Sequence, residues 1–153
     1  MRKSVFNFLR FFKVSTSGLA DSTLFDKHMF YDAFIKDLYN CKEEIIIECP
    51  FVTTTRASMF IPIFKKILRK EVNIHIITRD PEEIGIDVLL SSGNHHLKLA
   101  ILDRKILWEG SLNILSQSSS REIMRRIKGK QTAQQIFEFR QLSHFHPLLL
   151  VKK

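Results

Sequence analysis

The chain carries an imidazole and an ammonium two positions apart, at His96 and Lys98. In an extended strand alternate side chains share a face, so both groups are expected on the same side of a strand over residues 96–102. A neutral imidazole is a nucleophile near physiological pH, and a lysine ammonium is a compact positive charge suited to a phosphate oxygen. The pair therefore predicts attack on a phosphodiester.

The alternation in this segment also predicts which side chains are buried. One face of the strand is expected to be apolar and packed inward, while the other presents polar groups. The inward set is Leu97, Leu99 and Ile101, and the other set is His96, Lys98 and Ala100. A tight turn is expected near Asp103 and Arg104, and Gly110 is expected to permit a close backbone approach that a side chain would block.

These residues belong to a longer pattern, which reads H-x-K-x-x-x-x-D from His96 to Asp103 and then G-S-x-N from Gly110 to Asn113. The arrangement resembles the signature of the phospholipase D superfamily, and every position of that signature is matched. Glu122, in the segment SSSREIMRRI, lies where that superfamily usually has a glutamate.

The resemblance implies how the site would work. Two motif copies build one active site in this superfamily, and this chain has a single copy, which implies a homodimer with a shared site. His96 would form a phosphohistidine intermediate, Lys98 and Asn113 would hold the phosphoryl oxygens, and Ser111 would support them by hydrogen bonding. The catalytic set is completed by Glu122, which would orient the imidazole, and by Asp103, which looks structural or helps to orient the site. No metal and no cofactor is implied.

The composition allows one domain and favours a polyanionic partner. The chain has 153 residues, a net charge of +8 and 44% hydrophobic residues, which are ordinary values for a globular domain apart from the basicity. Cys41 and Cys49 have no metal-like spacing, so reduced thiols in a cytoplasmic protein are the simplest interpretation. No apolar run reaches the roughly 20 residues that cross a bilayer, so stable membrane insertion is not expected.

Periodicity predicts an α/β fold, with a mixed β-sheet flanked by helices on both faces. Residues 1–25 are expected to be an N-terminal extension with a short helix, 26–142 the phospholipase-D-like domain, and 143–153 a tail. Pro62 would damage a helix interior, so the helix that contains it is expected to begin late. Strands are expected at 44–49, 72–78, 84–90, 96–102, 106–108 and 122–127, and a last helix at 132–142.

The link between the second and third of these strands is unusually short. Only RDPEE separates the segments VNIHIIT and IGIDVLL. A parallel crossover needs about a dozen residues. The region around Asp80–Gly85 therefore predicts either a different strand pairing or the loss of an element that relatives use.

Three functions follow from these observations. The wider match resembles the phospholipase-D-like domains attached to DNA helicases and restriction-type nucleases, so a metal-independent DNA endonuclease is preferred, with a helicase or restriction-system partner. The basic run from Arg121 to Lys130 adds positive charge beyond the motif. The alternatives are a noncatalytic nucleic-acid-binding module, motivated by the short link, and a phospholipid headgroup phosphodiesterase.

Overall fold

The computed structural model describes residues 21–81, 89–90, 96–116 and 120–140. In chain order, the elements within these ranges are β1 (Ser22–Asp26), α2 (Lys27–Asn40), β2 (Glu44–Glu48), β3 (Phe51–Val52), α3 (Thr54–Leu68), β4 (Asn73–Thr78), β5 (Asp80–Pro81), β6 (Leu89–Leu90), β7 (Leu99–Leu102), β8 (Ile106–Gly110), β9 (Ile123–Lys128) and α4 (Lys130–Phe139).

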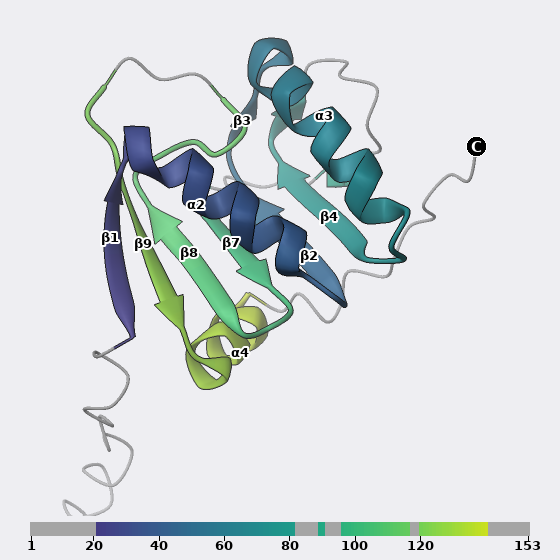
Figure 1. Cartoon of the computed structure of the whole chain (residues 1–153). Coiled ribbons are helices and arrows are strands. Elements are labelled where there is room, and N and C mark those ends of the chain that lie inside the picture. Colours follow the sequence, from purple (N-terminus) through teal and green to yellow (C-terminus); the bar gives the residue numbers. More distant parts are fainter. Residues whose placement is uncertain (1–20, 82–88, 91–95, 117–119, 141–153) are drawn as a thin grey trace, which may run out of the picture.

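Most of these strands form a single mixed sheet (Figure 1). Within the described ranges it has seven strands in the order β1-β9-β8-β7-β2-β4-β6, while β3 and β5 pair separately. Strands β2, β4 and β6 are parallel, whereas β7, β8, β9 and β1 continue the sheet in antiparallel fashion. Two apolar cores, one on each face of the sheet, hold the helices in place. The predicted α/β class, with helices on both faces of a mixed sheet, is confirmed.

The larger core lies under α2 and α3. Its centre is an aromatic cluster in which Phe30 and Phe34 of α2 meet Trp108 of β8, with ring centroids 5.2 and 5.9 Å from the indole. All three side chains are fully buried. Burial of each such side chain stabilises the fold by about 1.5–3 kcal/mol. This cluster therefore fixes the face of β8 that is turned away from α4.

The smaller core lies under α4. Ala133 and Phe137 of α4 pack against β7 and β8 through Leu99, Ile101 and Leu107. Because α2 covers one face and α4 the other, the strand β7 is buried on both sides along its whole length. The prediction that only one face packs inward is therefore wrong for β7. A strand covered by two layers reads as a continuous apolar run.

The extent of β7 also differs from the prediction. The strand begins at Leu99, so His96 and Lys98 precede it. Ala100, expected on the polar face, is fully buried, whereas Leu97, expected inside, is 41% exposed. Burial therefore changes along the chain at Leu99, where the helical layers end, rather than between alternate side chains.

Other boundaries shift in smaller ways. Pro62 lies inside α3, which begins at Thr54, so the expected late start of that helix is wrong. Residues 22–25, which we placed in the N-terminal extension, are strand β1 paired with β9, so the sheet begins ahead of that boundary. The helix expected in the extension falls mostly within residues 1–20, which lie outside the described residues. The tail and the end of the domain at 142 also lie outside them.

The short link after β4 leads to an edge strand. Leu89 and Leu90 form β6, which runs parallel to β4 opposite Ile77 and Thr78. Asp80 and Pro81 pair instead with β3. Most of the predicted strand over 84–90 lies outside the described residues. The described part shows a parallel pairing of only two residues, and the expected effect of the short link stays a prediction.

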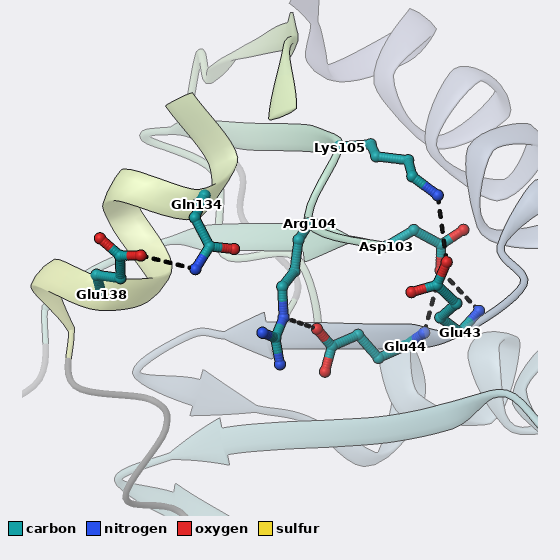
Figure 2. Close-up of polar contacts among 7 residues, drawn as sticks. All are labelled: Glu43, Glu44, Asp103, Arg104, Lys105, Gln134 and Glu138. Atoms are coloured by element: carbon teal, nitrogen blue, oxygen red, sulfur yellow. Dashed lines mark hydrogen bonds and ion pairs between the residues drawn. The ribbon is translucent and has the colours of Figure 1, made fainter. Parts of the chain in front are cut away.

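A three-residue loop, residues 103–105, joins β7 to β8, since Leu102 pairs with Ile106. Asp103 and Arg104 both have φ of 50°, and Lys105 N donates to Leu102 O at 2.9 Å, which defines a turn with two left-handed residues. Such conformations are uncommon outside glycine and asparagine. Figure 2 shows how contacts offset this cost, since Arg104 bonds Glu44 of β2 and Asp103 faces the chain just before that strand.

Candidate active site at the open end of strands β7 and β8

A groove of about 420 Å³ opens at the end of the sheet where β7 begins and β8 ends. His96 and Lys98 both line it, together with Gly110. His96 is exposed and Lys98 is half-buried. The groove therefore brings together the nucleophile and the cation that the sequence predicts, beside the last turn of α4.

Hydrogen bonds beyond β7 hold the backbone of this segment. Gly110 N donates to Lys98 O at 3.2 Å, so the pairing of the two strands continues past the regular part of β7. Lys98 Nζ donates to Ser111 O at 2.7 Å. An ammonium has three donors, so this bond positions the lysine and leaves capacity for an anionic oxygen.

Gly110 is required by a close approach of two strands. A Cβ at this position would lie 2.2 Å from Ile123 O and 2.9 Å from the Cα of Met124. Both contacts are with backbone, which cannot move aside as a side chain can. The prediction that Gly110 permits a close backbone approach is confirmed, and the neighbouring backbone belongs to β9.

Ser111 secures the same contact. Its N–H donates to Ile123 O at 3.0 Å, and its hydroxyl accepts from Ile123 N at 3.1 Å. The hydroxyl is therefore engaged with β9, and Ser111 is not among the residues that line the groove. This geometry fits the supporting role expected from the resemblance, because it fixes the carbonyl that positions Lys98.

Asn113 and Glu122 are not among the described residues that line the groove. Asn113 Oδ1 is buried and has no hydrogen-bond partner among the described residues. Buried polar atoms are nearly always paired, so a group left unpaired is expected to take a partner. Glu122 accepts a bond from Ser120 Oγ at 2.5 Å, and within the described ranges none joins it to His96. The orientation of the imidazole by Glu122 stays a prediction.

Asp103 lies at the other end of β7. Its carboxylate accepts three backbone N–H bonds, from Lys42, Glu43 and Glu44, at 2.8–3.0 Å. Figure 2 shows the bonds from Glu43 and Glu44. Seven residue-to-residue steps of extended chain lead from His96 to Asp103, which corresponds to roughly 23 Å. The structure therefore brings His96 and Lys98 together and leaves Asp103 away from them, as a clamp on the chain that enters β2.

Two further cations line the groove. Arg140, just after α4, forms two bonds to the fully buried carboxylate of Glu48 on β2, at 2.5 and 3.1 Å. Arg125 of β9 is exposed, and Glu109 is the carboxylate that the groove lining contains. The sequence pattern gave no role to Arg140 or Glu48, because their pairing joins residues 92 positions apart.

The basic run after the motif does not form one surface. Side chains alternate along β9, so Arg125 faces the groove while Arg126 faces α2. Arg126 contacts the Asp37 carboxylate at 3.4 Å, and its guanidinium lies over the rings of Phe25 and Trp108. Of this run, Arg125 is the residue placed to contribute positive charge at the site.

Exposed apolar side chains also line the groove, and the sequence patterns did not predict them. Four of the residues that line it are large, apolar and between 41% and 81% exposed: Leu24, Leu97, Ile123 and Phe139. They come from β1, the segment before β7, β9 and α4. Contiguous apolar surface of this kind is typical of protein–protein contacts. Their sequence signal was weak, because each is a single apolar residue in a different element.

Comparisons with known proteins agree on the fold. NucT from Helicobacter pylori has a TM-score of 0.65 at 18% identity, covering 79% of this chain and 93% of NucT. Nuc from Salmonella typhimurium, a phospholipase D family member, has a TM-score of 0.61 at 15% identity, covering 78% and 91%. Phosphatidylserine synthase from Haemophilus influenzae has 0.62 at 10% identity, covering 82% of this chain and 39% of the synthase.

No family model and no curated protein sequence matches the chain. The described part of the chain has the phospholipase D fold, as the motif predicted. None of the helices within the described ranges combines the length and the hydrophobicity needed to cross a membrane.

Proposed function

We propose that the chain is a metal-independent phosphodiesterase that cleaves nucleic acid, with DNA preferred, as a homodimer. The observation that carries the proposal is that His96 and Lys98 line one groove together with two arginines, Arg125 and Arg140. An imidazole beside clustered cations suits a phosphodiester, because the cations neutralise the charge that repels a nucleophile.

The reaction would take two displacements at phosphorus. An imidazole nitrogen of His96 attacks, a P–N bond forms, and the bond from phosphorus to the leaving oxygen breaks. The partner subunit's His96 donates a proton to that oxygen and then takes one from the water that breaks the P–N bond. Lys98 and Asn113 would bind the phosphoryl oxygens, with Asn113 Oδ1 paired through a neighbouring donor once the site is assembled.

The apolar rim supports the dimer. Leu24, Leu97, Ile123 and Phe139 surround the groove, so a second copy placed over it would bury them and bring a second imidazole to the same site. An association through one patch on both copies is the commonest form of symmetric dimer. The contact would also exclude water from the cations, which strengthens their interaction with a phosphate.

The nucleic-acid substrate is supported by the charge and by the resemblance of the motif. A net charge of +8 favours a polyanion. We also propose a helicase or restriction-system partner. This part of the proposal is supported by the sequence resemblance to phospholipase-D-like domains.

The direct test is cleavage of plasmid and short single-stranded DNA in excess chelator. His96→Ala should reduce the rate by at least about 10⁴-fold, because the nucleophile is lost. His28→Ala is the matched control, since His28 is also an exposed histidine but lies on α2, and it should retain full activity. The wild-type chain should also form an acid-labile phosphohistidine. Cleavage that needs a divalent cation and survives His96→Ala would refute the proposal.

The dimer is tested by charging its rim. Phe139 is 81% exposed, so Phe139→Glu should leave the fold intact while it opposes association. We expect this variant to sediment as a monomer. Its activity should fall in proportion to the loss of dimer. Met29→Glu is the control, because Met29 is 56% exposed on α2 and outside the groove. A Phe139→Glu monomer with full turnover would exclude a shared site.

A second candidate function is a noncatalytic nucleic-acid-binding module. The two-residue pairing of β6 with β4 after the short link favours it, since a shortened scaffold would misplace the site. It predicts salt-sensitive DNA binding with no turnover and no phosphohistidine. The headgroup phosphodiesterase would instead be identified by release of choline or glycerol from anionic vesicles.

A further inference from the structure

An exposed aromatic ring lies at the same end of the sheet as the groove, outside the motif. Phe51 of β3 is 47% exposed, while the next residue, Val52, is buried. The guanidinium of Arg79, itself exposed, lies 5.7 Å from the centre of the Phe51 ring. A large aromatic side chain beside a cation at the surface is the combination on which nucleobases stack.

The backbone that carries this pair is fixed. Arg79 N donates to Pro50 O at 3.3 Å, and Thr78 Oγ1 donates to the same oxygen at 3.1 Å. Phe51 also pairs with Asp80 in the β3–β5 ladder. Side chains on a backbone held in this way are suited to binding, because little further order is lost when a ligand arrives.

The pair lies close to the predicted catalytic residues along two paths. The register of β2 and β7 pairs Glu48 with Leu99, so the chain reaches Phe51 three residues after this pair and His96 three residues before it. In addition, Thr53 N donates to Leu115 O at 2.9 Å, which ties the segment after β3 to the loop that carries Asn113. Both paths place Phe51 at the His96 end of the sheet, at a separation of at most about 27 Å.

We infer that Phe51 and Arg79 form a stacking platform for an unpaired nucleobase of the substrate. The inference rests on the proposed function, because it requires nucleic acid as the substrate, and it narrows that substrate to single-stranded or locally opened strands. In a duplex both faces of each base are covered by neighbouring bases, so the Phe51 ring is of use only where a base is free. Arg79 adds positive charge for the adjacent phosphate.

The test measures binding without cleavage. In the full chain with His96→Ala, fluorescence anisotropy compares a labelled thymidine oligonucleotide with an abasic strand of equal length, which keeps the phosphates and lacks the bases. Phe51→Ala should weaken binding of the thymidine strand about tenfold, the loss expected for one stacked base. It should leave the abasic strand unchanged. An RNA strand of uridine should respond as the DNA strand does.

Two further variants keep the result interpretable. Phe51→Trp should restore the affinity, since it supplies another ring. Leu68→Ala, which removes an exposed apolar side chain at the far end of α3, should change neither affinity. Equal effects of Phe51→Ala on both strands, or none on either, would overturn the platform, as would the absence of any binding to either strand.

These outcomes separate the platform from the proposed enzyme. Base-dependent binding that Phe51→Ala removes, in a chain that never cleaves DNA, would uphold the platform and reject the catalytic function. Chelator-resistant cleavage that Phe51→Ala leaves intact, with unchanged binding of the thymidine strand, would uphold the catalytic function and reject the platform.

Discussion

The two ends of strand β7 have opposite surroundings, although one motif spans both. At the His96 end the helical layers stop, Leu97 is 41% exposed, and side chains that could do chemistry line a groove. At the Asp103 end the carboxylate accepts three backbone N–H groups, and Arg104 contacts both Glu44 and the ring of Phe137. The side chains at the first end are accessible to a ligand, whereas those at the second end are held by contacts within the chain.

Residues of one sequence motif can therefore have different tasks. Asp103 orients the chain that enters β2, and β2 in turn pairs with β7. Its carboxylate holds the fold at roughly 23 Å from His96. Four substitutions test this contrast between the two ends.

The largest effect is expected from Gly110→Ser at the open end. The new Cβ would meet the backbone of β9 at 2.2 Å, so the strands must separate, at a cost of at least about 3 kcal/mol in the free energy of unfolding. Urea denaturation measures this loss, and activity should fall with it. Gly129→Ser is the matched control, since its nearest neighbour is 3.9 Å away and its φ of 172° suits any residue. A stable Gly110→Ser chain would contradict the close approach.

Lys98→Ala should act on the rate rather than on the fold. Loss of a preorganised cation at a phosphoryl group lowers kcat by about 10²–10³-fold. Its control is Lys105→Ala at the closed end, where the ammonium forms an exposed pair with Glu43 at 3.3 Å. That pair contributes less than about 1 kcal/mol. Equal rate losses in both variants would show that the two ends do not differ in function.

Asp103→Ala should show the reverse pattern. Three hydrogen bonds from backbone N–H groups to a carboxylate are lost, which should reduce the free energy of unfolding by about 2–3 kcal/mol. Activity per folded molecule should be unchanged. Asp103→Asn keeps an acceptor and tolerates a left-handed backbone, so it should lose less stability. A selective loss of kcat at full stability would assign Asp103 to the reaction.

The smallest effect is expected on the pH dependence of stability, through His75. Burial lowers the pKa of His75 on β4 from 6.5, with the Glu44 carboxylate acting in the opposite direction. The folded chain therefore binds this proton less readily than the unfolded chain, so stability is present above pH 6.5 and declines as the pH falls below it. His75→Gln should flatten this decline in thermal unfolding curves. A decline of unchanged size in that variant would assign it to another group.

Much of the fold could be read from the sequence. The apolar runs at Glu44–Glu48 and Asn73–Thr78 became β2 and β4, and the stripe with Phe60 and Phe64 became the buried face of α3. Short-range rules suffice for such elements, because periodicity reports which side chains are buried. The rules failed at Pro62, where packing of α3 on the sheet outweighs the local cost of proline.

The candidate site could be read only in part. His96 and Lys98 have the spacing of a strand and share the groove, and Gly110 has the predicted close contact. The pair of Arg140 with Glu48, the apolar rim and the Phe51–Arg79 pair each join elements far apart in the chain. Such contacts leave no periodic signal, so they could not be predicted from local patterns.

The amino-acid sequence by itself determined the chemical groups and the need for a glycine beside them, because residue type and spacing along an extended chain fix both. Only the tertiary structure decided where those groups are accessible. Helices on both faces bury every residue of β7, so exposure begins where the layers end, at Leu97 and His96, and the motif is divided between an open and a closed end.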